Sequence, residues 1–174
     1  MISVYIDTNC INARQDNTAI NELEKLYHDD MLLIEKSDTL DTELSHGSGY
    51  PKGQKKSLDY IESYGPAVVG LSRVGSSIVG SEEDDKRLSK VLEILWGKKI
   101  RSAYSMQDMG DAMHITTAAR YGGNYFVTNE KRLLKKSKEI KDEFGIEVCT
   151  PEDCLDKVLK RIKVLEENGH DPRQ

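Results

Sequence analysis

The stretch MISVYIDTN, residues 1–9, decides the fold class of this chain. Residues 2–6 are β-branched, aromatic and small, without a charge, which is typical of a short buried strand. Asp7, Thr8 and Asn9 follow at once and predict a polar turn. In open parallel sheets ligands bind outside the carboxyl ends of the strands, so this turn is a candidate site.

Strands and helices alternate along the rest of the chain. Further strands are predicted at residues 31–34, 125–127 and 146–149. Apolar residues at helical spacing predict helices at 19–27, around 38–44, at 54–64, 88–95, 105–121 and 151–162. Connections of this length favour parallel strands with crossover helices. The sequence therefore predicts an α/β fold, a three-layer α/β/α sandwich with a central parallel sheet.

Length and charge restrict the domain organisation and the partners. The 174 residues fit about one domain, predicted over residues 1–166, with an insertion at about 47–104 and a disordered tail at 167–174. The 25 Lys and Arg against 30 Asp and Glu give a net charge of −5. This balance excludes a broadly cationic chain that bulk charge would hold to nucleic acid or membrane, but allows a local basic patch.

The lack of membrane and secretion signals and the three cysteines indicate a protein of a reducing compartment. No apolar run approaches the ~20 residues of a membrane helix, and residues 1–7 lack the features of a secretory signal. Cys10, Cys149 and Cys154 do not suggest a disulfide framework, and we expect them in or near the core. Cys149 and Cys154 have no second Cys pair or nearby His, so zinc is not expected. We predict a cytoplasmic protein without membrane association.

Four acidic side chains are candidates for one site. Asp7 and Glu130 each follow a predicted strand, and they face one crevice if those strands are neighbours. Asp111 lies inside a predicted helix, beyond the first turn where capping would explain a carboxylate. Glu43 lies on a short helix after the second strand, with Asp41 as its near competitor. Each acid alone fits a turn or a solvated helix face, and only their combination favours a site.

Converging carboxylates without Cys and His spacing suit a hard divalent cation, Mg²⁺ or Mn²⁺. Such an ion offsets the repulsion between like charges, activates water and neutralises charge on a phosphoryl group. These acids therefore predict phosphodiester or phosphate chemistry. Asp108 and His114 lie one helical turn on either side of Asp111. We interpret His114 as a supporting residue rather than a metal ligand.

Four segments in order resemble the motifs of a PIN domain over roughly residues 1–150. They are Val4-Tyr-Ile-Asp7-Thr-Asn9, Glu43-Leu44, Asp111-Ala-Met-His114-Ile-Thr-Thr-Ala-Ala119 and Tyr125-Phe-Val-Thr-Asn-Glu130-Lys-Arg-Leu133. The resemblance implies an α/β/α sandwich with Mg²⁺- or Mn²⁺-dependent ribonuclease activity. Many members are VapC-type toxins of toxin–antitoxin pairs, and PIN domains often form homodimers. An antitoxin and a second copy of the chain are therefore candidate partners besides RNA.

The resemblance also implies roles for individual residues. Asp7, Glu43 and Asp111 would be acidic metal ligands, with Asp108 as a further candidate. Glu130 would take the place of the fourth acid, usually Asp, and its longer side chain leaves direct or water-mediated contact open. The accompanying polar residues would be Thr8, Asn9, Thr128, Asn129 and His114. The implied reaction is hydrolysis of single-stranded RNA by metal-activated water, leaving a 5′-phosphate and a 3′-hydroxyl.

Basic residues next to the predicted site are candidates for RNA binding. They follow Glu130 directly and comprise Lys131, Arg132, Lys135 and Lys136. Two other basic groups are interpreted as solvated faces: Lys52, Lys55 and Lys56, and Lys98, Lys99 and Arg101. At 6% aromatic residues, extensive base stacking is not evident from the sequence.

Two alternative functions stay open. The first is a PIN-like module that binds RNA or protein without cleavage, because Glu130 departs from the family pattern. The second is a phosphatase of the haloacid dehalogenase type, which also places Asp after the first strand. That class normally needs a second Asp two residues on, where this chain has Asn9.

Overall fold

Five parallel strands form the single sheet of the computed structural model, which describes residues 1–13, 16–40, 43, 60–68, 72 and 77–173. The strands pair in the order β3-β2-β1-β4-β5. Their bounds are Ile2–Ile6 (β1), Leu32–Ser37 (β2), Ile61–Ser63 (β3), Tyr125–Val127 (β4) and Glu147–Cys149 (β5). The predicted parallel sheet is thereby confirmed.

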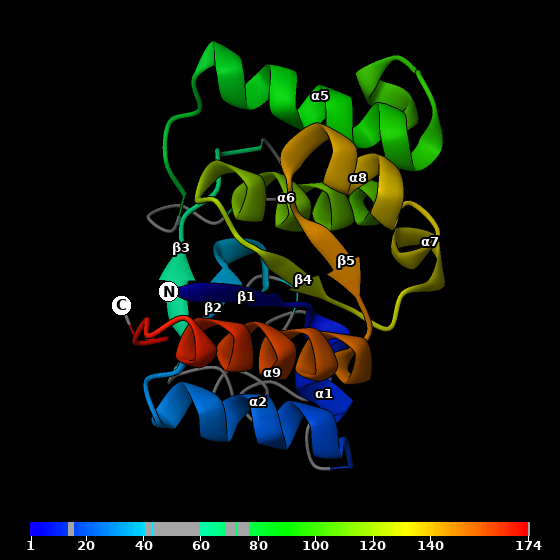
Figure 1. Cartoon of the computed structure of the whole chain (residues 1–174). Coiled ribbons are helices and arrows are strands. Elements are labelled where there is room, and N and C mark those ends of the chain that lie inside the picture. Colours follow the sequence, from blue (N-terminus) through cyan, green and yellow to red (C-terminus); the bar gives the residue numbers. More distant parts are fainter. Residues whose placement is uncertain (14–15, 41–42, 44–59, 69–71, 73–76, 174) are drawn as a thin grey trace.

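Helices cover both faces of this sheet (Figure 1). Helices α1 (Thr8–Ala13), α2 (Thr18–His28) and α9 (Pro151–Glu167) pack on one face, against Val4 and Ile6 of β1. The other face carries α6 (Met106–Arg120), α7 (Lys131–Leu134) and α8 (Ser137–Phe144), and α5 (Glu82–Trp96) packs on the outer side of α6 (Figure 1). A short 3-10 helix, Arg101–Ala103, connects α5 and α6. The three-layer α/β/α sandwich predicted from the alternating pattern is confirmed.

Capping side chains set where several helices begin. Asn17 accepts a hydrogen bond from the backbone N–H of Ile20 at the start of α2. Thr150 caps α9, with Pro151 at its first position. Ser81 and Asp84 form a capping box at the start of α5. These caps fix the helix boundaries because they satisfy backbone N–H groups that have no partner within the helix.

Two local predictions are wrong. Residues 7–9 do not form a separate turn, since α1 begins at Thr8 and the Asp7 carbonyl accepts from the N–H groups of Cys10 and Ile11. The helix predicted at 54–64 is contradicted at Ile61–Ser63, which pair with β2 as strand β3. The Tyr5 and Ser63 hydroxyls both bond to the Glu35 carboxylate of β2, a tertiary contact that overrides local helix propensity.

Other predictions lie outside the described residues: Leu44, Asp41, the helix over 54–59 and the group Lys52, Lys55 and Lys56. The limits of the insertion and of the tail stay predictions. All three cysteines are free and buried, as expected. None of the helices within the described ranges is long and apolar enough to cross a membrane.

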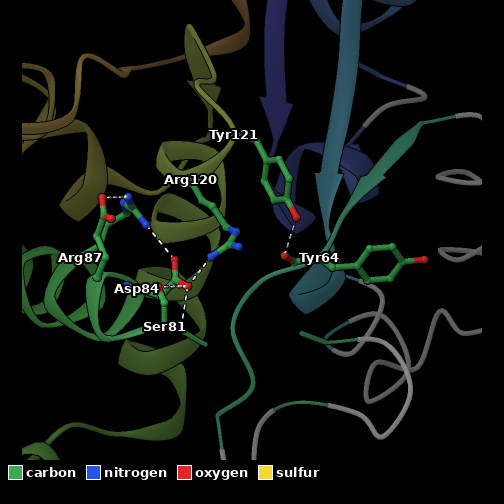
Figure 2. Close-up of polar contacts among 7 residues, drawn as sticks. Tyr64, Ser81, Asp84, Arg87, Arg120 and Tyr121 are labelled. Carbon is green, nitrogen blue, oxygen red and sulfur yellow. Dashed lines mark hydrogen bonds and ion pairs between the residues drawn. The ribbon is translucent and has the colours of Figure 1, made fainter. Parts of the chain in front are cut away.

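A buried ion-pair cluster connects α5 to the end of α6 (Figure 2). The Asp84 cluster consists of Ser81, Asp84, Arg87 and Arg120. Asp84 accepts from Arg87 Nη1 at 2.8 Å, from Arg120 Nη1, and from the Ser81 N–H at 2.9 Å. Burial alone would raise the pKa of Asp84, but the Ser81 and Arg120 bonds lower it to about 2. The cluster holds the C-terminal end of α6 against α5.

Candidate metal centre

The carboxyl ends of β1 and β4 lie side by side where the strand order reverses. Strand β1 pairs with β2 on one side and with β4 on the other. The Asp7 N–H donates to the Val127 carbonyl at 3.0 Å, so Asp7 and Thr128 follow the two strands at the same level. Such a switch point opens a crevice at the edge of a parallel sheet. Four ionisable side chains gather here, and we call Asp7, Glu43, Asp111 and His114 the acid–histidine cluster.

Asp7 is buried and held in place by polar neighbours. Its Oδ2 accepts from Thr128 Oγ1 at 2.5 Å and from Asn9 Nδ2 at 2.7 Å. Asn9 Oδ1 in turn accepts from the Asn129 N–H at 3.1 Å. Burial raises the pKa of Asp7, although the His114 charge and the Thr128 bond oppose the increase. The side chain is therefore oriented before any ligand arrives.

Glu43 reaches the cluster from the helical segment that follows β2. Its Oε2 accepts from Thr8 Oγ1 at 2.5 Å and lies 3.2 Å from His114 Nε2. Burial would raise the pKa of Glu43, but the charge and hydrogen bond of His114 lower it below its ordinary value. A Cβ at Gly110 would lie 2.9 Å from Glu43 Oε1, so α6 approaches Glu43 closely only because residue 110 has no side chain.

Helix α6 supplies His114 from its buried face. The His114 side chain is 2% exposed, and its Nδ1 lies 2.6 Å from Ser37 Oγ at the end of β2. Burial would lower the pKa of His114, but Glu43, Asp7 and Asp111 raise it to about 9. Without a bound cation, this shift favours the protonated imidazole, whose positive charge then balances part of the negative charge of the cluster.

Asp111 lies one turn before His114 on the same helix. Burial and the charges of Asp7 and Glu43 raise its pKa to about 7. Its Oδ2 is buried and has no hydrogen-bond partner among the described residues. An unpaired buried carboxylate oxygen is costly, so its presence needs a reason such as a ligand.

The donor atoms fit a bound cation. One ligand atom each from Asp7, Glu43 and His114 lies within 4.8 Å of the others. Three carboxylates face a single imidazolium, so the cluster carries excess negative charge. The cluster could bind a metal. Carboxylate ligands alone would favour Mg²⁺ or Mn²⁺, and a ligating His114 would favour a softer ion.

The structure brings most of the predicted site residues together. Asp7, Glu43 and Asp111 converge, and Thr8, Asn9, Thr128 and Asn129 contact them or each other. Two predicted acids lie in other surroundings. Glu130 caps α7 and contacts Arg132, and Asp108 forms a capping box with Ser105. Neither has a described contact with the cluster.

The sequence interpretation underestimated three residues. The sequence predicts a supporting role for His114, yet a ring nitrogen of His114 lies within 4.8 Å of ligand atoms of Asp7 and Glu43. The signal is its position one turn after Asp111 on a helix that is otherwise mostly apolar or small. The sequence gives Ser37 and Gly110 no role in the site, because only the packing of β2 and α6 against Glu43 and His114 gives them one.

The basic residues predicted to bind RNA lie on and after α7. Lys131, Arg132 and Lys135 are exposed, and Lys136 pairs with Glu139 at 2.9 Å. The charge of Arg132 lowers the pKa of Asp111, which indicates that α7 borders the cluster. Positive charge is thus available beside the acidic centre.

Comparison with known proteins adds no relative. No protein-family model matches the chain, and no curated protein is significantly similar to it. The geometry and chemistry of the acid–histidine cluster therefore carry the functional argument.

Proposed function

We propose that this protein is a Mg²⁺- or Mn²⁺-dependent endoribonuclease of the PIN type that hydrolyses single-stranded RNA. The observation that carries the proposal is the group of Asp7, Glu43 and His114, whose ligand atoms lie within 4.8 Å of one another, beside a third acid, Asp111, whose Oδ2 is buried and unpaired and whose pKa is raised by the charges of Asp7 and Glu43. Asp7, Glu43 and Asp111 are the three acids on which the sequence resemblance depends. Metal-dependent hydrolysis of phosphodiesters needs such a group of carboxylates.

Asp7, Glu43 and Asp111 would hold the ion. When bound, it would lower the pKa of a water molecule and neutralise charge on the phosphate. Thr8 and Thr128 keep the Glu43 and Asp7 carboxylates oriented through hydrogen bonds. No nucleophilic side chain is required by this scheme.

His114 would act as a positioning residue. Its Nδ1 is held by Ser37, and its Nε2 lies beside Glu43. Its positive charge moderates the repulsion among the three carboxylates and keeps the Glu43 carboxylate ionised. Glu130 would act indirectly, because it caps α7 and contacts Arg132 at the edge of the cluster.

Substrate phosphates would be bound by the basic residues of α7 and its C-terminal cap, Lys131, Arg132, Lys135 and Lys136. The resemblance further suggests a toxin controlled by an antitoxin, or a homodimer, as the biological setting. Copurification of the chain with a small protein would test the antitoxin. The elution volume of the purified chain in size-exclusion chromatography would test the homodimer.

The test is metal-dependent cleavage of end-labelled single-stranded RNA. Wild-type protein is titrated with Mn²⁺ and Mg²⁺ beside Asp7→Asn, Asp111→Asn and, as a matched control, Asp156→Asn on the exposed face of α9. Wild type and Asp156→Asn should cleave only with metal, and the two cluster variants should not. RNA that is retained but uncut at every metal concentration would instead favour a binding module.

A phosphatase mechanism makes a different prediction. It requires a phosphoryl group on the Asp7 carboxylate and a second acid at position 9 as proton donor. Asn9 instead donates its amide to Asp7 Oδ2. Detection of an acyl-phosphate on Asp7 after incubation with a phosphomonoester would overturn the nuclease proposal.

A further inference from the structure

A second concave site lies in the outer helical layer. A cavity of about 440 Å³ opens between α5 and the segment that joins it to α6. None of its lining residues belongs to the acid–histidine cluster. They are Asp85, Lys86, Ser89, Lys90, Leu92, Glu93, Lys98, Lys99, Arg101 and Tyr104. The volume lies within the range of roughly 300–1,000 Å³ common for small-molecule sites.

The cavity is basic, although the chain as a whole is acidic. Five cationic side chains and two acidic ones line it, and Glu82 and Glu143 lie beside two of these lysines, which leaves an excess of one positive charge. Arg101 pairs with Asp85, Lys86 pairs with Glu82 at 2.7 Å, and Lys90 lies about 4 Å from Glu93 and Glu143. Such exposed pairs contribute little and exchange readily for another anion.

Two lysines at the mouth of the cavity are available for an anion. Within the described part of the chain, neither Lys98 nor Lys99 has a carboxylate partner at ion-pair distance, and both side chains are exposed. Lys99 Nζ lies 5.5 Å from the centroid of the Tyr104 ring, so one cation stands next to an aromatic surface. The sequence alone interprets these lysines as a solvated face, but here they line an open, concave cavity.

Tyr104 forms a preorganised aromatic wall. Its hydroxyl donates to the Gly97 carbonyl at 2.8 Å and accepts from the Lys99 N–H at 3.0 Å. Gly97 ends α5 with a φ of +78°, a conformation that glycine adopts without strain. These contacts fix the ring relative to Lys98 and Lys99. An oriented ring beside cations that have no carboxylate partner is the combination that binds a base and its phosphate in single-stranded nucleic acid.

We infer that this cavity binds a nucleotide unit, with the phosphate on Lys98 and Lys99 and the base against Tyr104. We assign this nucleotide unit to a single-stranded RNA. The cavity is then a second RNA-binding site of the proposed ribonuclease, separate from the acid–histidine cluster. The identification of RNA rests on the proposed function. A free mononucleotide carries the same chemistry and is separated from RNA by the experiment.

The test uses Trp96, the single tryptophan and the last residue of α5, as a fluorescent reporter beside the cavity. AMP and a short adenosine oligoribonucleotide are titrated into the full Asp111→Asn chain in EDTA, where no cleavage takes place. Both ligands should change the fluorescence saturably, and the oligonucleotide should bind more tightly. Because no metal is present, failure of the nuclease assay leaves this measurement unaffected.

Three variants locate the binding. Lys98→Gln/Lys99→Gln should reduce the slope of log affinity against log salt for the oligonucleotide by about 1.4, at ~0.7 for each lost phosphate contact. Tyr104→Leu should weaken binding about five- to a hundredfold through lost stacking, whereas Tyr104→Phe keeps the ring and most of the affinity. The control Lys160→Gln/Lys163→Gln makes the same charge change on α9 and should leave binding unaltered.

The outcomes separate the possibilities. An unchanged salt slope in Lys98→Gln/Lys99→Gln, or an equal reduction in the α9 control, would overturn the assignment of the phosphate to this cavity. If neither AMP nor the oligonucleotide binds, as checked by calorimetry, the assignment is overturned as well. Saturable binding of AMP without binding of the oligonucleotide would overturn RNA as the source and leave a site for free nucleotides.

Discussion

Carboxylates are buried beside α6 in two places, and cationic partners balance their charge in one place but only partly in the other. In the Asp84 cluster, one acid meets two arginines and a capping serine, and its pKa falls to about 2 (Figure 2). In the acid–histidine cluster, three acids share one imidazole, and the pKa of Asp111 rises to about 7. The chain can neutralise a buried acid completely. An acidic group that it leaves partly unneutralised, at a switch point of the sheet, is better explained by a cation than by stability.

The largest expected effect is on stability without metal. Asp84→Asn should lower the free energy of unfolding by about 3 kcal/mol, because two arginines lose their buried partner. Asp111→Asn makes the same chemical change but removes a repulsive charge, so it should raise the free energy of unfolding by about 1 kcal/mol. Urea denaturation at pH 7.5 in EDTA measures both. Equal destabilisation by the two variants would remove the contrast between the clusters.

The second-largest expected effect is the increase in Tm on metal binding, which should depend on the acid–histidine cluster and not on the Asp84 cluster. Mn²⁺ at a hundred times its dissociation constant stabilises the folded state by about 2.7 kcal/mol, or roughly 5–10 °C in Tm for a chain of this size. Asp84→Asn should keep this increase although it starts from a lower Tm, and Asp7→Asn should lose most of it. Thermal denaturation with and without Mn²⁺ gives the values. An undiminished increase in Asp7→Asn would place the metal elsewhere.

The fold could be predicted where local signals and burial agree. Strand β1 is an uncharged, mostly β-branched and aromatic run with every residue buried, and Asn17 and Thr150 begin helices as their side-chain chemistry requires. Strand β3 could not be predicted, because Ile61-Glu-Ser63 is not an apolar run like Tyr125-Phe-Val127 and is extended through its pairing with β2. Its buried Ser63 has meaning only beside Glu35, which is distant in the sequence.

The candidate site could be predicted where topology alone places a side chain. Asp7 follows the central strand, and every residue at that point lies at the carboxyl edge of the sheet. Glu130 and Asp108 have the same chemistry but begin helices, where nearby backbone N–H groups bind a carboxylate. Sequence spacing does not separate these two cases. The central place of His114 depends on Ser37 and Glu43, which reach it only in the folded chain.

The pH dependence of stability should differ in sign between the clusters. Because the folded pKa of Asp111 is raised from 3.8 to about 7, its stabilising contribution is present below about pH 4 and is lost as the pH rises to about 7. Asp84 contributes above about pH 4 and loses its contribution as the pH falls towards 2. In EDTA, wild type should therefore lose about 2 kcal/mol relative to Asp111→Asn between pH 4 and pH 7.5. Urea titrations at several pH values check this, and parallel curves for the two proteins would contradict it.

The smallest expected effect tests the packing that brings Glu43 into the cluster. In a helix interior Gly→Ala ordinarily stabilises by about 1 kcal/mol, but a Cβ at Gly110 would meet Glu43 Oε1 at 2.9 Å. Gly110→Ala should therefore gain little or no stability in EDTA and should bind Mn²⁺ more weakly, since Glu43 must move away from Thr8 and His114. The matched control is Ser89→Ala on the exposed face of α5, which should leave the metal-induced increase in Tm unchanged. A Gly110→Ala variant that is more stable by the full helix-propensity gain and binds Mn²⁺ like wild type would show that Glu43 takes no part in holding the ion.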